Sequence, residues 1–207
     1  MTLDNYFRDY LHRTDDKVMT KMDHYLDVYH RLLAPWRSQD ISFLEIGIWK
    51  GGSIKMWQDY FGAESRLTFL DIDPACKAFE VPGLTVEIGD QSDGIFLQDV
   101  ATKHGPFDII IDDGGHKMHQ QIASFNALWP RLSDGGIYVV EDTDTSYWPG
   151  FGGGFRAQNS FVEFSKDLID RMHSWYTDQD DIFPFHPIAK ALSSVQFYDS
   201  MVVCEKN

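Results

Sequence analysis

Two acidic residues and a histidine follow a strongly apolar run in the middle of the chain. Residues 107–111 read as a buried strand, and the run Asp112-Asp113-Gly114-Gly115-His116 comes directly after it. A later apolar run ends in Glu141 and Asp142. Ligands bind beyond the carboxyl ends of the strands in an open parallel sheet. We therefore expect Asp113, Glu141 and Asp142 to converge at that edge.

Three carboxylates brought together repel one another unless a cation neutralises them. Ligation by oxygen, with no cysteine nearby, favours a hard ion, with Mg²⁺ first and Mn²⁺ next. His116 lies close beyond Asp113 and is the candidate general base for a metal-bound hydroxyl, because imidazole ionises near neutral pH. The alternative is that the acids cap helices and the glycines form an ordinary turn. The matching acids on the next strand favour the metal site.

A glycine-rich turn follows an earlier apolar run, in the segment Glu45-Ile46-Gly47-Ile48-Trp49-Lys50-Gly51-Gly52-Ser53. Glycines there let the backbone approach a ligand without a Cβ in the way. The spacing is not the G-x-G-x-x-G dinucleotide pattern, and no lysine follows as a P-loop requires. A tight turn between a strand and a helix is therefore an equal interpretation.

Two further polar groups follow later strands. Asp71, about twenty residues past the glycine turn, suits hydrogen bonding to a ribose diol, whereas Asp73 suits a cap before Pro74. The segment Gly89-Asp90-Gln91-Ser92 could meet an adenine edge, or it forms a turn in which Asp90 or Ser92 caps a helix. These acids do not distinguish NAD from S-adenosylmethionine. An NAD-linked oxidoreductase, however, gives no reason for the acidic cluster.

Strands and helices alternate around these residues. The predicted strands cover 41–46, 67–70, 85–88, 107–111 and 136–140, and the predicted helices cover 53–61, 95–103 and 119–129. This alternation predicts an α/β fold with a parallel sheet covered by helices on both faces. Two β runs at 195–198 and 200–204 would close the sheet as a hairpin.

The flanking segments complete a single predicted domain over 1–207. Helical spacing over 3–36 predicts one or two leading helices ended by Pro35, and 41–142 would be the cofactor- and metal-binding core. Residues 143–175 would form an acceptor loop and helix, and 195–207 the closing strands. The aromatic, glycine-rich part of that loop is a natural lid.

Composition excludes several classes of partner. The 207 residues include 32 Asp and Glu against 18 Lys and Arg, a net charge of −14, which repels nucleic acid and anionic lipid. Hydrophobic residues make up 43% of the chain, enough for a packed core. The two cysteines, Cys76 and Cys204, form no disulfide or zinc pattern. Without a signal peptide or membrane-length apolar run, we expect a cytoplasmic protein.

Three of these segments resemble the metal-dependent sugar O-methyltransferases: Glu45 to Ser53, Asp112 to His116, and Glu141 to Pro149. Members of that family act on macrolide deoxysugars, and relatives methylate rhamnose or mannose units. The resemblance implies a Rossmann-like class I methyltransferase fold with a mostly parallel seven-stranded sheet. It also implies S-adenosylmethionine and Mg²⁺ as cofactors and a saccharide or glycosylated natural product as the acceptor. The family usually has serine where this chain has Gly115.

The resemblance also assigns roles to residues. His116 would be the general base, and the metal ligands would be Asp113, Glu141 and Asp142. The cofactor would be surrounded by Glu45, Gly47, Ser53, Asp71, Asp90, Gln91 and Asp112. Catechol O-methyltransferases share the acidic spacing but have lysine at the position of His116. A sugar acceptor is therefore favoured, and an aromatic diol is the alternative.

Two aromatic residues after the second acidic pair, Tyr147 and Trp148, are candidates for acceptor binding because pyranose faces stack on aromatic rings. Packing within their own loop is the alternative interpretation. The leading helices and the aromatic surplus are compatible with a homodimer.

Overall fold

A seven-stranded sheet organises the protein, and the computed structural model describes residues 5–13 and 19–207. The strands lie in the order β3-β2-β1-β4-β5-β7-β6. Their bounds are β1 Ser42–Ile46, β2 Arg66–Asp71, β3 Leu84–Ile88, β4 Phe107–Asp112, β5 Leu132–Val140, β6 Leu192–Tyr198 and β7 Met201–Lys206. Strands β1 to β5 are parallel, and β7 runs antiparallel to both β5 and β6. The mostly parallel sheet expected from the sequence is confirmed.

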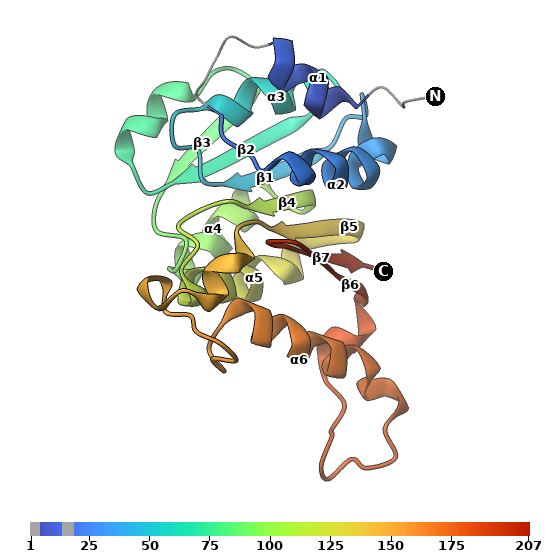
Figure 1. Cartoon of the computed structure of the whole chain (residues 1–207). Helices are drawn as coiled ribbons and strands as arrows, with labels where there is room; N and C mark the ends of the chain where they lie inside the picture. The colour runs from blue at the N-terminus through green and yellow to red at the C-terminus, as the bar shows by residue number, and fades with distance from the viewer. Residues whose placement is uncertain (1–4, 14–18) are drawn as a thin grey trace.

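Helices cover both faces of this sheet (Figure 1). One face carries α1 Tyr6–Arg13, α2 Asp23–Leu33 and α3 Gly52–Tyr60, and the other carries α4 Gly94–His104, α5 Met118–Leu128 and α6 Phe161–His173. Short 3₁₀ turns connect several of these elements: η1 Ala34–Trp36, η2 Pro74–Phe79, η3 Trp129–Arg131, η4 Thr143–Tyr147, η5 Pro149–Phe151, η6 Ser174–Tyr176 and η7 Pro187–Lys190.

Alternate residues of each central strand point into two separate apolar layers. Phe43 and Ile109 belong to the layer under α1 to α3, whereas Leu44 and Ile110 belong to the layer under α4 to α6. Because both faces are covered, the strands are apolar without a polar alternation. Trp57 on α3 is fully buried in the first layer. Truncating such a side chain costs about 3–5 kcal/mol of stability.

The boundaries of two predicted elements differ from the structure. Strand β5 begins at Leu132, ahead of the predicted start at residue 136, because an irregularity in its pairing with β4 accommodates a glycine turn. Gly135 adopts a left-handed φ of 75° there. Part of the predicted leading helices falls at residues 14–18, outside the described residues. Beyond that gap, Met19 and Met22 precede α2 instead of lying within a helix.

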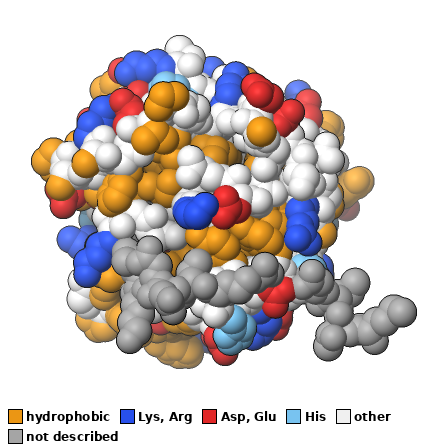
Figure 2. All heavy atoms as spheres, turned by 90° about the horizontal axis from the view of Figure 1, so that it is seen from above, with side chains coloured by type: hydrophobic (Ala, Val, Ile, Leu, Met, Phe, Trp, Pro, Cys, Tyr) orange, Lys and Arg blue, Asp and Glu red, His pale blue; other side chains and the backbone are white. Residues whose placement is uncertain are grey.

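The face seen from above is mixed in character (Figure 2). Apolar side chains are grouped between charged ones of both signs, so the net negative charge is not concentrated on this face. Within residues 5–13 and 19–207, no helix is long and apolar enough to cross a membrane.

Candidate active site

The ends of three central strands lie side by side at one edge of the sheet. Ile46 at the end of β1 pairs in register with Asp112 at the end of β4, and Asp112 pairs with Val140 of β5. Residues that follow these strands are therefore neighbours in space. This is also the place where the strand order reverses, since β1 lies between β2 and β4. Such a reversal opens a crevice for ligands in α/β sheets.

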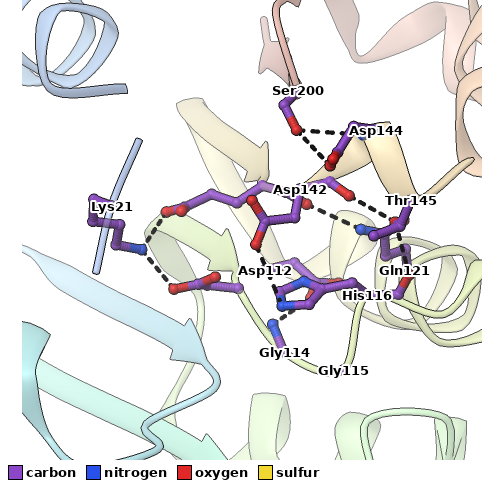
Figure 3. A network of polar contacts seen from close by, with 12 residues as sticks. Lys21, Asp112, Gly114, Gly115, His116, Gln121, Asp142, Asp144, Thr145 and Ser200 are labelled. Carbon is purple, nitrogen blue, oxygen red and sulfur yellow. Dashed lines mark hydrogen bonds and ion pairs between the residues drawn. The ribbon is translucent and has the colours of Figure 1, made fainter. Parts of the chain in front are cut away.

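Two of the three acids predicted to converge, Asp113 and Asp142, come together at this edge, and His116 lies with them. One oxygen or nitrogen atom from each lies within 4.8 Å of the others. His116 Nε2 lies 3.4 Å from Asp142 Oδ2 (Figure 3). The two carboxylate oxygens at this spacing suit a hard divalent cation, and the imidazole nitrogen lies beside them. The positions fit a metal site, and the ligand roles stay predictions.

The second oxygen of the Asp142 carboxylate is held by a tyrosine from α2. Tyr25 OH lies 2.9 Å from Asp142 Oδ1 and 2.8 Å from the carbonyl oxygen of Ser200, to which it can also donate. The backbone N–H of Asp142 donates to the same tyrosine oxygen at 3.1 Å. Asp142 is thus positioned by the N-terminal α2 and by the turn between β6 and β7.

Glu141 occupies a different environment from the other two predicted ligands. Its side chain is 1% exposed and accepts hydrogen bonds from Lys21 Nζ, at 2.6 Å, and from Tyr29 OH. It lies outside the group formed by Asp113, His116 and Asp142. Burial raises the pKa of Glu141, the nearby Asp113 adds to the rise, and Lys21 opposes it. The structure therefore places Glu141 beside the group, with its carboxylate directed toward Lys21.

Lys21 is a residue of the site that the sequence analysis missed. Its Nζ also lies 2.6 Å from Asp113 Oδ2, so one ammonium bridges two acids that follow different strands (Figure 3). The side chain is 4% exposed. Burial by itself would lower the pKa of Lys21, but attraction to Asp113, Glu141 and Glu45 outweighs it and raises this pKa above its ordinary value, so the residue is charged at neutral pH. Nothing in the local sequence around Lys21 marks it as buried.

A cavity of about 270 Å³ adjoins Asp113 at the same edge, and we call it the edge cavity. Five of the seven residues predicted to contact a cofactor line it, namely Gly47, Ser53, Asp71, Asp90 and Gln91. The other two, Glu45 and Asp112, do not line the edge cavity, because both side chains are fully buried behind the residues that do. Glu45 accepts a hydrogen bond from Ser53 Oγ at 2.5 Å, and Asp112 accepts one from Gln91 Nε2 at 3.0 Å.

The glycine turn of the edge cavity is fastened by Asp71. The backbone N–H groups of Ile48 and Trp49 donate to Asp71 Oδ2 at 2.8 and 2.9 Å. Burial alone would raise the pKa of Asp71, but these donors and the N–H of Asp73 keep it below its ordinary value. Gly47 has a φ of 97°, and a Cβ there would stand 2.1 Å from the carbonyl oxygen of Asp113. Only glycine allows this approach.

The capping residues can now be assigned. Asp73 Oδ1 accepts from the N–H of Ala75 at 2.9 Å, which confirms its predicted role as a cap before Pro74. The alternative interpretation of this segment, in which Asp90 or Ser92 caps the next helix, is wrong about the capping residue. Asp93 is the N-cap of α4, while Asp90 Oδ1 accepts hydrogen bonds from the N–H and hydroxyl of Ser92.

The predicted acceptor residues lie on the turns that follow β5. Tyr147 ends η4 and Trp148 precedes η5, and each is 50% exposed. Trp148 also makes an edge contact with Phe151, with ring centroids 5.6 Å apart. Both rings are therefore open to solvent, and Trp148 is also packed within its own loop.

The sheet order with its single antiparallel strand β7, and the cavity beside β1 and β4, define the class I methyltransferase fold. The model of a methyltransferase domain family matches residues 44–143 of this chain. The resemblance to sugar O-methyltransferases is confirmed by similarity to curated relatives.

One relative is the 8-demethyl-8-α-L-rhamnosyl tetracenomycin-C 2'-O-methyltransferase of Streptomyces olivaceus. It is 35% identical in an alignment of 191 residues, and the match covers 88% of this chain and 50% of the relative. The demethylmacrocin O-methyltransferase of Streptomyces fradiae is 42% identical over 73% of this chain and 40% of its own length. A crystal structure of MycE from mycinamycin biosynthesis, in complex with Mg and SAH, matches with a TM-score of 0.86 and 30% identity. That match covers 98% of this chain and 52% of MycE. The chain thus spans about half the length of these relatives, or less.

Proposed function

We propose that this chain is an S-adenosylmethionine-dependent, Mg²⁺-dependent O-methyltransferase that methylates a sugar hydroxyl. The observation that carries the proposal is the group of Asp113, His116 and Asp142, set directly beside the edge cavity. Asp113 belongs to both, so a metal-bound hydroxyl and a cofactor in the cavity would meet there. The relatives named above support the same class of reaction.

The residues of the edge cavity fit the proposed cofactor. Asp71 at the end of β2 suits a ribose diol, and Asp90 and Gln91 suit the base. Gly47 approaches the backbone of Asp113 so closely that no side chain could be accommodated at this point of the cavity lining. Ser53 lies at the start of α3, where the backbone N–H groups of a helix N-terminus stabilise a carboxylate group.

When bound, the metal lowers the pKa of the acceptor hydroxyl and the cofactor supplies an electrophilic methyl group. Asp113 and Asp142 would hold the metal, with Glu141 beside them. His116 would take the hydroxyl proton, and its Nε2 lies 3.4 Å from Asp142 Oδ2. Thr145 Oγ1 lies 2.9 Å from the carbonyl oxygen of His116 and steadies that residue. Tyr147 and Trp148 would present aromatic faces to the acceptor sugar.

Neither alternative function is favoured. The curated relatives named above are sugar O-methyltransferases, which supports a saccharide rather than an aromatic diol. Asp113, His116 and Asp142 would have no role in hydride transfer to a nicotinamide.

We propose a small-molecule glycoside as the partner, with no nucleic acid. A cytoplasmic location is supported by the two buried free thiols of Cys76 and Cys204. The homodimer stays a prediction, and light scattering would test it by measuring the molar mass in solution.

The test begins with isothermal titration of S-adenosylmethionine and Mg²⁺ into the wild type and into Asp113→Ala. We expect micromolar-range cofactor binding by the wild type and loss of metal binding in the variant. Methyl transfer is then measured to methyl α-L-rhamnopyranoside and to 3,4-dihydroxybenzoate, with Mg²⁺ and with EDTA. Transfer to the glycoside that requires Mg²⁺ supports the proposal. Transfer to the diol alone would replace it with the catechol-type function, and binding of NAD alone would exclude methyl transfer.

A further inference from the structure

Residues 19–22 form a short segment, here called the strap, that lies across the edge cavity ahead of α2. Met19, Thr20 and Lys21 of the strap line the cavity. A Cβ on Gly52 at the start of α3 would stand 2.8 Å from the backbone nitrogen of Met19, so the strap packs tightly against that helix. Residues 19–22 belong to neither a helix nor a strand. The strap therefore depends on other contacts for its position.

The ammonium of Lys21 provides such a contact. It lies 2.6 Å from Asp113 Oδ2 and 2.6 Å from Glu141 Oε1, with the lysine side chain 4% and the Glu141 side chain 1% exposed. Among the described residues that line the edge cavity, Lys21 has the one cationic side chain. Ion pairs with water excluded are much stronger than surface pairs, and removing one partner leaves a buried charge without compensation.

Glu141 anchors the strap from outside the edge cavity. The cavity is lined by Asp113 but not by Glu141, whose carboxylate is held between Lys21 and Tyr29. Tyr29 belongs to α2, the helix that continues from the strap. Glu141, which follows β5, thus fixes the strap through Lys21. The same carboxylate fixes α2 through Tyr29.

We propose that Lys21 is a positioning residue for the cofactor, acting with Glu141 to hold the strap as one wall of the edge cavity. The inference rests on the proposed function, in which this cavity binds S-adenosylmethionine. Its distinctive consequence is that Glu141, which does not reach the cavity, contributes to cofactor affinity through Lys21. This contribution is independent of any metal ligation by Glu141.

A double-mutant cycle read out by binding tests this proposal. S-adenosylhomocysteine is titrated calorimetrically, in buffer with EDTA, into the wild type, Lys21→Met, Glu141→Gln and the double variant. Because EDTA removes divalent cations, a metal-ligand role of Glu141 cannot influence the result. We expect the Kd to rise at least about tenfold in Lys21→Met and about threefold or more in Glu141→Gln. In the Lys21→Met background, Glu141→Gln should change the Kd by less than about twofold.

Two matched controls accompany the cycle. Lys55→Gln removes an exposed lysine from α3, and Asp144→Asn removes an acid from the turn after β5 that bonds to Ser200 and not to Lys21. Neither should change the Kd, and thermal unfolding of each variant shows whether it is folded. If Lys21→Met does not fold, the Kd values of Glu141→Gln and Asp144→Asn are compared instead. A Kd that rises in Glu141→Gln but not in Asp144→Asn supports the proposal, and equal Kd values overturn it.

The outcomes separate the two proposals. If the wild type does not bind S-adenosylhomocysteine, the proposed function is overturned. If the wild type binds and folded Lys21→Met binds equally well, only the role of Lys21 is overturned. Full additivity of the two substitutions would also overturn it, because Glu141 would then act by another route.

Discussion

His116 and Asp142 face each other across the candidate active site, with Nε2 of the histidine 3.4 Å from Oδ2 of the aspartate. Both residues have left-handed backbones, with φ of 53° and 52°. This conformation costs on the order of 1–3 kcal/mol in a residue other than glycine and persists where the surroundings enforce it. Thr145 Oγ1 lies 2.9 Å from the carbonyl oxygen of His116 and 2.6 Å from that of Asp142. One threonine hydroxyl, which has a single proton to donate, therefore lies within hydrogen-bond distance of the carbonyl groups of both strained residues.

Replacement of His116 by asparagine tests its role as the base. We expect kcat for methyl transfer to fall by about 100-fold or more, because a positioned general base contributes on the order of 10²–10⁴ in rate. The Kd for S-adenosylhomocysteine should stay within about twofold, since His116 does not line the edge cavity. His119→Asn, an exposed histidine on α5, is the control. A variant that retained more than a tenth of the wild-type kcat would assign the proton transfer elsewhere.

Alanine at Trp148 or Tyr147 tests the proposed sugar platform. Loss of one aromatic face should raise KM for the glycoside by about two- to tenfold, the equivalent of roughly 0.5–1.5 kcal/mol, with kcat changed less. Steady-state kinetics at saturating S-adenosylmethionine measure this. Tyr176→Ala, a ring that is 84% exposed and follows α6, is the control. Unchanged KM in both variants would mean that the two rings serve only the packing of their loop.

The buried Glu45 predicts a particular pH dependence of stability. Burial, the largest cause, raises the pKa of Glu45 from 4.5 to about 7, although Lys21 and Ser53 oppose the rise. The folded protein therefore binds this proton more tightly than the unfolded chain does. The stability that Glu45 contributes is fully present below about pH 4.5 and is lost as the pH rises through about 7. The full effect is on the order of 3 kcal/mol.

Urea unfolding at several pH values, in buffer with EDTA, measures this dependence in the wild type and in Glu45→Gln. The decline of the free energy of unfolding between pH 4.5 and pH 7 should be shallower in the variant, because glutamine does not titrate. Glu64→Gln, at an exposed position, should leave the decline unchanged. Parallel curves for the wild type and Glu45→Gln would show that Glu45 is ionised in the folded protein throughout this range.

The cap of α4 gives a prediction about stability alone. Asp93 Oδ1 accepts hydrogen bonds from the N–H groups of Ile95 and Phe96, at 3.0 and 3.2 Å. Asp93→Ala should lower the free energy of unfolding by about 1 kcal/mol. Asp99→Ala removes the same charge from the exposed middle of α4 without removing a cap, and should change stability by less than about 0.5 kcal/mol. Equal losses in both variants would attribute the effect to charge rather than to capping.

Much of the active-site edge could be predicted from the sequence, because its residues come directly after strands that short apolar runs identify. The apolar runs of β1, β4 and β5 are read directly from the chain, and parallel pairing then brings their ends together. Asp113, His116 and Asp142 follow those ends within a few residues. Gly47 and Ser53 were found for the same reason, since they belong to the turn that leaves β1.

The residues that the sequence did not reveal act across long separations. Glu141 is 120 residues from Lys21 and 112 residues from Tyr29 along the chain. Helical spacing marked α2 as a packing helix, but it does not show that two of its tyrosines carry their hydroxyls into the site. The sequence also did not show that Glu45 and Asp112 lie behind the lining of the edge cavity. An apolar strand pattern does not reveal which side chains near the end of the strand are buried and which reach the cavity.

The contacts of Tyr25 have a consequence for the order in which the protein can be assembled. This tyrosine joins Asp142, 117 residues away, to Ser200, 175 residues away in the turn between β6 and β7. During synthesis, the central strands leave the ribosome well before that turn does. A nascent chain halted after β5 would have Asp113, His116 and Asp142 but lack the carbonyl group that fixes Tyr25 beside Asp142. The full arrangement around Asp142 therefore becomes available only after the hairpin of β6 and β7 has emerged.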